Sequence, residues 1–161
     1  MASKIIPNIS VDCVVFGYDV TTKSLNVLLI KRYLESKETH EILVNDYVLT
    51  GYHTLENETM DDTATRVLME LTGLDNLYKK QFKVFGDPNR LTNEKDIIWV
   101  ESENFNPRTI TIAYYFLVKT HEVDIEKNSH QPQWFPVNNL PELGFDHKKI
   151  IHEAYADLKA K

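Results

Sequence analysis

Residues 49–74 constrain the fold of this chain more than any other stretch, because they combine a strand end, a loop and one amphipathic helix. The apolar residues of the predicted helix recur at three- and four-residue spacing, which places them on one face. That stripe consists of Met60, Ala64, Val67, Leu68 and Leu71. Thr59 is in position to cap the helix N-terminus, with Asp61 and Asp62 in the first turn, where the helix dipole favours negative charge. Gly73 is in position to end the helix in a left-handed conformation.

The rest of the sequence is that of one globular domain. Its 161 residues are enough to bury a core, and a formal net charge of −6 argues against a general nucleic-acid-binding surface. No segment approaches membrane-spanning length, and the apolar run near the N-terminus is too short for a signal peptide, so we expect a cytoplasmic protein. The single cysteine, Cys13, excludes an intramolecular disulfide and lies in an apolar run, which favours a buried thiol.

Runs of β-branched and aromatic residues predict strands over 9–18, 25–31, 47–49, 78–85, 109–119 and 133–137. A second amphipathic helix is predicted over 148–159, with Asp146 as its N-cap. His147 and His152 do not share a face of that helix, so a zinc pair is not expected. Residues 33–46 are polar and acidic and predict a mobile loop over the site. Residues 91–106 predict an inserted loop or short hairpin, whose carboxylates are either solvated or available to a metal. Those carboxylates are Glu94, Asp96, Glu101 and Glu103.

The helix and the loop before it resemble the signature of the Nudix family. That signature is Gly, five residues, Glu, seven residues, Arg-Glu, an aliphatic residue, any residue, Glu-Glu, any residue, Gly and an aliphatic residue. The matching positions are Glu58, Arg66, Leu68, Glu70, Gly73 and Leu74. Three positions depart from the signature: Tyr52 replaces its first Gly, Val67 the Glu after Arg66, and Leu71 the second Glu of the pair.

These departures concern the chemistry that the resemblance implies. Nudix enzymes hold Mg²⁺ on carboxylates, so Glu58 and Glu70 are the implied metal ligands, and with Arg66 they form the remnant of a catalytic site. Positions 67, 70 and 71 share one helix face, and only Glu70 is charged there. We therefore expect a weakened or lost hydrolase site, with Val67 and Leu71 as core residues. Residual activity stays open, because Mg²⁺ can bind one or two carboxylates together with substrate phosphates.

A second set of residues resembles the Nudix-derived sensing domains of bacterial transcriptional regulators. It comprises Phe85-Gly86, Arg90, Arg108, Ala113-Tyr114-Tyr115 and Phe145-Asp146-His147. The insertion between Arg90 and Arg108 departs from that pattern. In those dimeric regulators the Nudix domain binds an effector such as ADP-ribose or a pentose such as arabinose, and a C-terminal winged helix binds DNA.

The same resemblance implies a set of ligand-binding residues: Arg32, Tyr52, His53, Arg90 and Arg108. Alternative interpretations are a solvated strand end for Arg32, a structural or solvated His53, and pairing of Arg90 and Arg108 with the acidic insertion.

The expected structure is one Nudix-like domain over 1–161, an α/β sandwich with a mixed sheet between two helices. The expected function is binding of a sugar or nucleotide-sugar effector in a homodimeric regulator, with no nucleic acid bound through this domain and no membrane contact. The alternative is a Mg²⁺-dependent hydrolase that cleaves a nucleoside diphosphate linked to another moiety.

Overall fold

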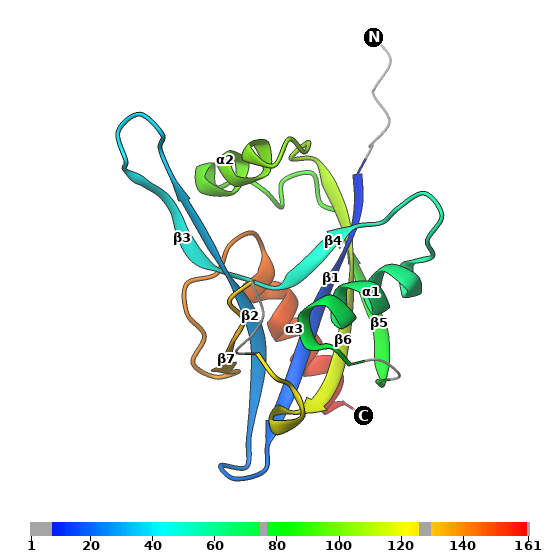
Figure 1. The fold of residues 1–161 in the computed structure, drawn as a ribbon. Coiled ribbons are helices and arrows are strands. Elements are labelled where there is room, and N and C mark those ends of the chain that lie inside the picture. Colours follow the sequence, from blue (N-terminus) through cyan, green and yellow to red (C-terminus); the bar gives the residue numbers. More distant parts are fainter. Residues whose placement is uncertain (1–7, 75–76, 126–129, 161) are drawn as a thin grey trace.

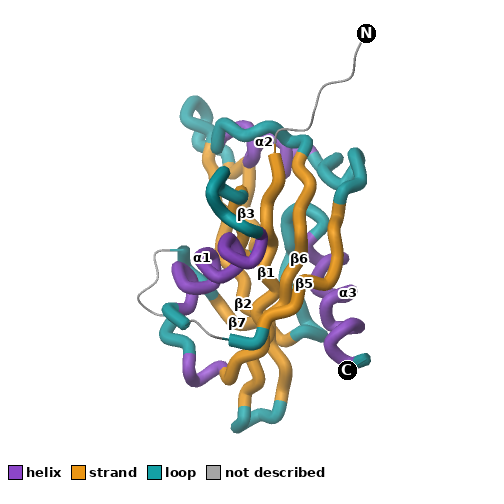
Figure 2. Tube along the Cα trace, turned by 90° about the vertical axis from the view of Figure 1, so that its right-hand side faces the viewer, coloured by secondary structure: helices purple, strands orange, loops and turns teal. Residues whose placement is uncertain are grey.

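A computed structural model describes residues 8–74, 77–125 and 130–160 of the chain (Figure 1). The strands are β1 (Asn8–Asp19), β2 (Ser24–Glu35), β3 (Ile42–Val48), β4 (Thr50–His53), β5 (Lys79–Phe85), β6 (Thr109–Lys119) and β7 (Gln133–Pro136). The helices are α1 (Met60–Thr72), α2 (Glu94–Ser102) and α3 (His147–Lys159), with a 3-10 turn at Thr120–Glu122. Helices α1 and α3 cover opposite faces of the sheet (Figure 2).

The sheet is mixed, in the order β3-β2-β1-β6-β5. Strands β1 and β6 run parallel along their length, and the remaining pairs are antiparallel. Strand β4 pairs with β1, and β7 pairs with β2. The predicted α/β sandwich with a mixed sheet is therefore confirmed.

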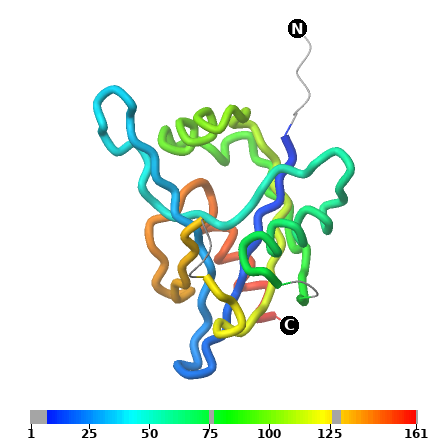
Figure 3. The backbone as a smooth tube through the Cα atoms, in the orientation of Figure 1, coloured from blue at the N-terminus to red at the C-terminus, as the bar shows by residue number. Residues whose placement is uncertain are grey.

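Strands β1 and β2 separate halfway along their length. They pair from Phe16 opposite Val27 to Asp19 opposite Ser24, whereas β2 pairs with β3 from Ile30 onward. The first half of β1 pairs instead with β4, which crosses between the two diverging strands (Figure 3). This divergence is what makes room for a site at the end of the sheet next to α2.

Alternation along the strands builds two cores, one on each face of the sheet. On the α1 side, Val11, Cys13 and Val15 pack with the helix stripe, and on the α3 side Val14 and Phe16 pack with the stripe of α3. The buried Cys13 agrees with the prediction. Among the described helices, none has both the length and the apolar character needed to cross a membrane.

Helix α1 begins and ends where the sequence predicts. The Thr59 hydroxyl accepts from the Asp62 N–H at 3.0 Å, and the Asp62 carboxylate accepts from the Thr59 N–H at 3.0 Å. This reciprocal cap satisfies two N–H groups that the first turn leaves without partners. Gly73 ends the helix with φ 72°, a conformation that favours glycine.

Two loop predictions were wrong. Residues 33–46 form the outer part of a hairpin between β2 and β3, because Arg32, Val44 and Asp46 point inward and tie the two strands together. Residues 91–106 contain helix α2, capped by the Asn93 side chain. The periodicity of α2 is hidden because Asp96 is its only buried residue and its apolar residues are all half-buried.

Candidate functional site

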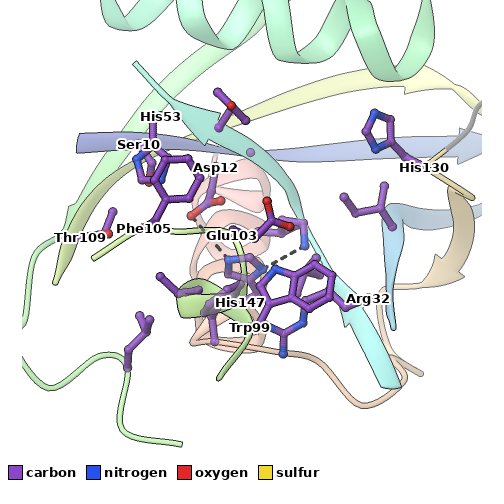
Figure 4. A pocket seen from close by; sticks show the side chains of 18 of the residues that line it. Ser10, Asp12, Arg32, His53, Trp99, Glu103, Phe105, Thr109, His130 and His147 are labelled. Carbon is purple, nitrogen blue, oxygen red and sulfur yellow. Dashed lines mark hydrogen bonds and ion pairs between the residues drawn. The ribbon is translucent and has the colours of Figure 1, made fainter. Parts of the chain in front are cut away.

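A cavity of about 560 Å³ opens where β1 and β2 diverge. Its walls come from β1, β2, β4, α2, the turn after β5 and the start of α3. Figure 4 shows Arg32 and Trp99 at one end of this cavity, His53 and Phe105 at the other, and Asp12 with His147 between them.

Arg32 is the most deeply buried charged residue of the cavity wall, with 1% of its surface exposed. Its Nε and Nη2 donate to the two carboxylate oxygens of Asp46 at 2.8 Å, and Nη2 also donates to Asp96 at 2.8 Å. Burial favours the neutral guanidine, but the two carboxylates outweigh it and raise the pKa of Arg32. The interpretation of Arg32 as a solvated strand end is therefore wrong.

The third nitrogen of this guanidinium group, Nη1, does not take part in these ion pairs. Arg32 Nη1 is buried and has no hydrogen-bond partner among the residues that the structure describes. The guanidinium carbon lies 4.5 Å from the ring centroid of Phe145 and 5.4 Å from that of Trp99. Phe145 has φ 55°, a left-handed backbone conformation that is costly for a non-glycine residue and often marks a functional position.

Asp12 and His147 form a second buried pair, which the sequence analysis did not single out. The Leu49 N–H donates to Nδ1 of His147 at 3.0 Å, and Nε2 of the same ring lies 3.6 Å from a carboxylate oxygen of Asp12. That oxygen also accepts from the Thr111 hydroxyl at 2.8 Å. Burial opposes the charged carboxylate, but His147, Arg90 and Thr111 outweigh it and lower the pKa of Asp12. The available signal was an aspartate inside the otherwise apolar run 11–16.

The other end of the cavity is aromatic. The rings of His53 and Phe105 have centroids 4.1 Å apart, and Tyr52 meets Phe105 edge-on at 6.4 Å. Burial lowers the pKa of His53 despite the nearby charge of Asp12, so its imidazole is neutral at pH 7. His53 Nδ1 is buried and without a hydrogen-bond partner in the described part of the chain.

The structure thus brings four of the five predicted ligand-binding residues to one cavity: Arg32, Tyr52, His53 and Arg90. Arg90 is engaged by Asp146 through two hydrogen bonds of 3.0 and 2.8 Å, rather than by the acidic insertion. Asp146 stands at the N-cap position of α3 but makes no capping hydrogen bond, because its carboxylate is used by Arg90. Arg108 is not part of the cavity wall.

No model of a known protein family matches the sequence. The ADP-ribose pyrophosphatase of Methanocaldococcus jannaschii is 27% identical over 136 residues, which are 83% of this chain and 68% of that protein. The ADPR responsive transcriptional repressor NtrR of Acinetobacter baylyi is 25% identical over 161 residues, 96% of this chain and 56% of that protein. The chain therefore spans little more than half of the length of the repressor.

Solved structures of Nudix proteins have the same fold as this chain. A mutT/nudix family protein from Listeria innocua superposes with a TM-score of 0.75 at 23% identity, covering 98% of this chain and 97% of that one. The NUDIX domain of Shewanella oneidensis NrtR, solved in complex with ADP ribose, gives a TM-score of 0.66 at 24% identity, covering 98% and 90%. This chain has the Nudix fold. The predicted resemblance to Nudix proteins and to their regulators is confirmed.

The Nudix helix itself carries a reduced set of polar residues. Arg66 donates to both carboxylate oxygens of Glu58, at 2.7 and 2.9 Å, and this pairing lowers the pKa of Glu58 to about 2. Glu58 also accepts from the Leu55 N–H and the Thr63 hydroxyl, each at 3.0 Å. A carboxylate with four donors serves to fix the loop before α1, and this use does not favour Glu58 as a metal ligand.

Two of the three departures from the Nudix signature, Val67 and Leu71, lie in the core. Val67 and Leu71 are 3% and 2% exposed and pack between α1 and the sheet, so they are core residues, as predicted. Glu70 is on the surface, 3.8 Å from Arg66, and none of the remnant box residues lines the cavity. The described residues contain no group of three or more His, Cys, Asp or Glu side chains suited to a metal ion. The box of this chain does not fit the multi-carboxylate Mg²⁺ platform, so we derive no metal-dependent step from it.

Proposed function

We propose that this Nudix domain binds a small sugar-containing ligand, a nucleotide sugar or a free sugar, without hydrolysing it. The observation that carries the proposal is the burial of Val67 and Leu71. Where Nudix hydrolases have carboxylates for the metal, this chain has two core residues whose burial contributes roughly 1.5–3 kcal/mol each. The face of α1 that carries Val67 and Leu71 therefore stabilises the fold.

The binding half of the proposal rests on the cavity. Its volume of about 560 Å³ is within the range of roughly 300–1,000 Å³ typical of small-molecule sites. It combines aromatic walls with buried polar atoms, Arg32 Nη1 and His53 Nδ1, that have no partner within the described chain. Since buried polar atoms nearly always have a hydrogen-bond partner in native proteins, two such atoms in one cavity support a ligand there.

The ligand class is supported by similarity. One related protein is named as an ADPR responsive repressor, and one related domain was solved in complex with ADP ribose. We infer that ADP-ribose is the first ligand to test and a free pentose such as arabinose the second.

In this proposal the domain is the effector-binding part of a cytoplasmic regulator. The net charge of −6 argues against a general DNA-binding surface on this chain, so in this proposal DNA is not bound through this domain. We further infer a homodimer, because the regulators that it resembles are dimeric. Light scattering that shows only monomer at high protein concentration would contradict this inference.

The second candidate is a Mg²⁺-dependent pyrophosphatase. It is favoured by the similarity to an ADP-ribose pyrophosphatase and by the retention of Glu58, Arg66 and Glu70 from the box. A related bifunctional protein from Francisella tularensis was solved with AMP and a manganese ion.

One experiment separates the candidates. The protein is incubated with ADP-ribose with and without Mg²⁺ or Mn²⁺, while melting temperature and AMP release are followed in parallel. A non-hydrolytic sensor is stabilised by the ligand, by about 2.7 kcal/mol at a hundredfold excess over Kd, and releases no AMP above background. Cleavage at about 1 per second or faster, the ordinary range for enzymes, would establish the hydrolase instead.

A matched pair of variants shows whether the cavity is the binding site. His53→Ala removes a cavity-wall side chain, whereas Tyr78→Ala changes an exposed aromatic residue outside the cavity wall. We expect the first variant, and not the second, to lose most of the stabilisation by ligand. Equal stabilisation of both variants would place the ligand elsewhere.

A further inference from the structure

The end of the cavity around Arg32, which we call the guanidinium end, is lined by Arg32, Trp99 and Phe145, and Asp96 accepts from Arg32 outside the cavity wall. Arg32 and Trp99 lie together there in Figure 4. Arg32 is 1% exposed, and its Nη1 is the one guanidinium nitrogen without a partner in the described residues. An N–H donor that is removed from water without an acceptor is destabilising, so this end of the cavity is suited to a ligand atom that accepts a hydrogen bond.

The charge around Arg32 is already balanced. Lys95 donates to Asp46 at 2.7 Å and to the exposed Glu142 at 3.1 Å, so two cations, Arg32 and Lys95, face two buried carboxylates, Asp46 and Asp96, and one exposed carboxylate. A phosphate group placed at Nη1 would lose its hydration without meeting a net positive charge. An uncharged acceptor makes the same hydrogen bond without that loss. The guanidinium end therefore favours a neutral oxygen over an anionic one.

The aromatic walls add a second requirement. Trp99 is half-buried and lines the cavity, and Phe145 lies on the guanidinium group. A sugar ring suits such walls, because its carbon face can be buried against an indole while its hydroxyl groups meet polar atoms at the ring edge. Trp99 comes from α2, within the insertion that departs from the pattern of the regulator domains.

We propose that the guanidinium end is a subsite for an uncharged, hydroxyl-bearing sugar ring, in which a ring hydroxyl accepts from Arg32 Nη1 and the ring packs on Trp99. This inference rests on the proposed function, since it assumes that the cavity holds the ligand. The same ring chemistry is offered by a free pentose and by the terminal ribose of ADP-ribose. The subsite selects the sugar and excludes a terminal phosphate.

The test compares three probes, ADP-ribose, ADP and free arabinose, on the whole chain and its variants by titration calorimetry. ADP has the same adenosine diphosphate as ADP-ribose but lacks the terminal sugar. Trp99→Ala removes the ring wall, and Trp99→Phe keeps an aromatic face. Glu101→Ala is the matched control, because Glu101 is an exposed residue of α2 outside the cavity wall. The melting temperature of each unliganded variant verifies that it is folded.

We expect Trp99→Ala to weaken ADP-ribose by about tenfold or more and to leave ADP within about twofold, where tenfold corresponds to about 1.4 kcal/mol. Trp99→Phe should retain most of the affinity, and Glu101→Ala all of it. If arabinose binds and ADP-ribose does not, the ligand is a free sugar, and arabinose affinity should then show the same dependence on Trp99.

Salt provides a readout that a merely structural role of Trp99 would not change. Raising the ionic strength from about 0.01 M to about 1 M shortens the Debye length from about 30 Å to about 3 Å. The factor by which Trp99→Ala weakens ADP-ribose should stay constant over this range, because the ring that Trp99 contacts is uncharged.

The outcomes distinguish this inference from the proposed function. If Trp99→Ala weakens ADP and ADP-ribose equally, or neither, the subsite assignment is wrong while ligand binding by the domain stands. A factor for Trp99→Ala that changes with salt would also overturn it, since it would place a charged group of the ligand at the guanidinium end. If none of the three probes binds the unmodified protein, the proposed function fails and the subsite fails with it.

Discussion

Asp46, Asp96 and Glu142 each pair with Arg32 or Lys95, but their hydrogen bonds and their burial differ enough to predict three different effects on stability. Side-chain exposure is 0% for Asp46, 4% for Asp96 and 75% for Glu142. Replacing each in turn by alanine therefore measures how strongly burial amplifies one kind of interaction.

Asp46→Ala should be the most destabilising. Asp46 accepts from two nitrogens of Arg32 and from Lys95, so its loss leaves buried positive charge under-compensated. Removing one partner of a buried ion pair typically costs about 3–5 kcal/mol. Against a total stability of about 5–15 kcal/mol, this change would bring the domain close to unfolding.

Asp96→Ala should cost less, because the two-point pairing of Arg32 with Asp46 survives. The loss frees one Arg32 donor and the Phe145 N–H, which donates to Asp96 at 3.0 Å. Leaving such groups unsatisfied costs about 1–3 kcal/mol. Glu142→Ala removes only a solvent-exposed contact of 3.1 Å with Lys95, worth about 0–1 kcal/mol.

The assay is urea unfolding followed by circular dichroism and by tryptophan fluorescence, with coincident transitions as the check for two-state behaviour. The expected order of destabilisation is Asp46→Ala, then Asp96→Ala, then Glu142→Ala. If Glu142→Ala costs as much as Asp46→Ala, or if Asp46→Ala costs less than about 1 kcal/mol, burial does not govern this cluster and the reasoning is refuted.

Three further predictions concern the crossing of β4, the loop before α1 and the Nudix helix. Gly51→Ala should destabilise the protein while Gly86→Ala should not, as measured by melting temperature, because a Cβ at Gly51 would lie 2.3 Å from an oxygen of Asp12 and one at Gly86 meets nothing closer than 3.7 Å. The pKa of Glu58 is lowered to about 2, so the stability that its ionised carboxylate adds to the folded protein is present above pH 4.5 and lost as pH falls toward 2. The melting temperature of Glu58→Gln should therefore decline less over this pH interval than that of the unmodified protein. The double change Val67→Glu with Leu71→Glu should lower the melting temperature, since it places two carboxylates at buried positions, and should raise Mg²⁺ affinity in calorimetry, since it restores two carboxylates of the Nudix signature. A folded double variant with unchanged Mg²⁺ affinity would contradict this prediction.

Several residues of the candidate site could be proposed from the sequence, because the motifs of the Nudix family and its regulators occur at fixed spacings along the chain. Tyr52, His53 and Arg90 line the cavity, and their contact with a ligand stays a prediction. The burial and the contacts of the site residues were not predictable. The sequence left Arg32 open between ligand contact and solvated strand end, and the structure buries it against Asp46 and against Asp96, 64 residues away. The Asp12–His147 pair was missed for the same reason, since β1 and the start of α3 meet only in the folded sheet.

The sequence by itself determined helix α1, its cap, its glycine stop and its buried stripe, together with most of the strands. These features depend on residues within one or two turns of each other, and on periodicity that the chain displays locally. The tertiary structure decided helix α2, the long hairpin of β2 and β3, and the cavity between the diverging strands. Those features depend on polar contacts between residues that are far apart in the sequence. A buried charge is stable only when its partner lies beside it, and local sequence patterns do not show which distant residue that partner is.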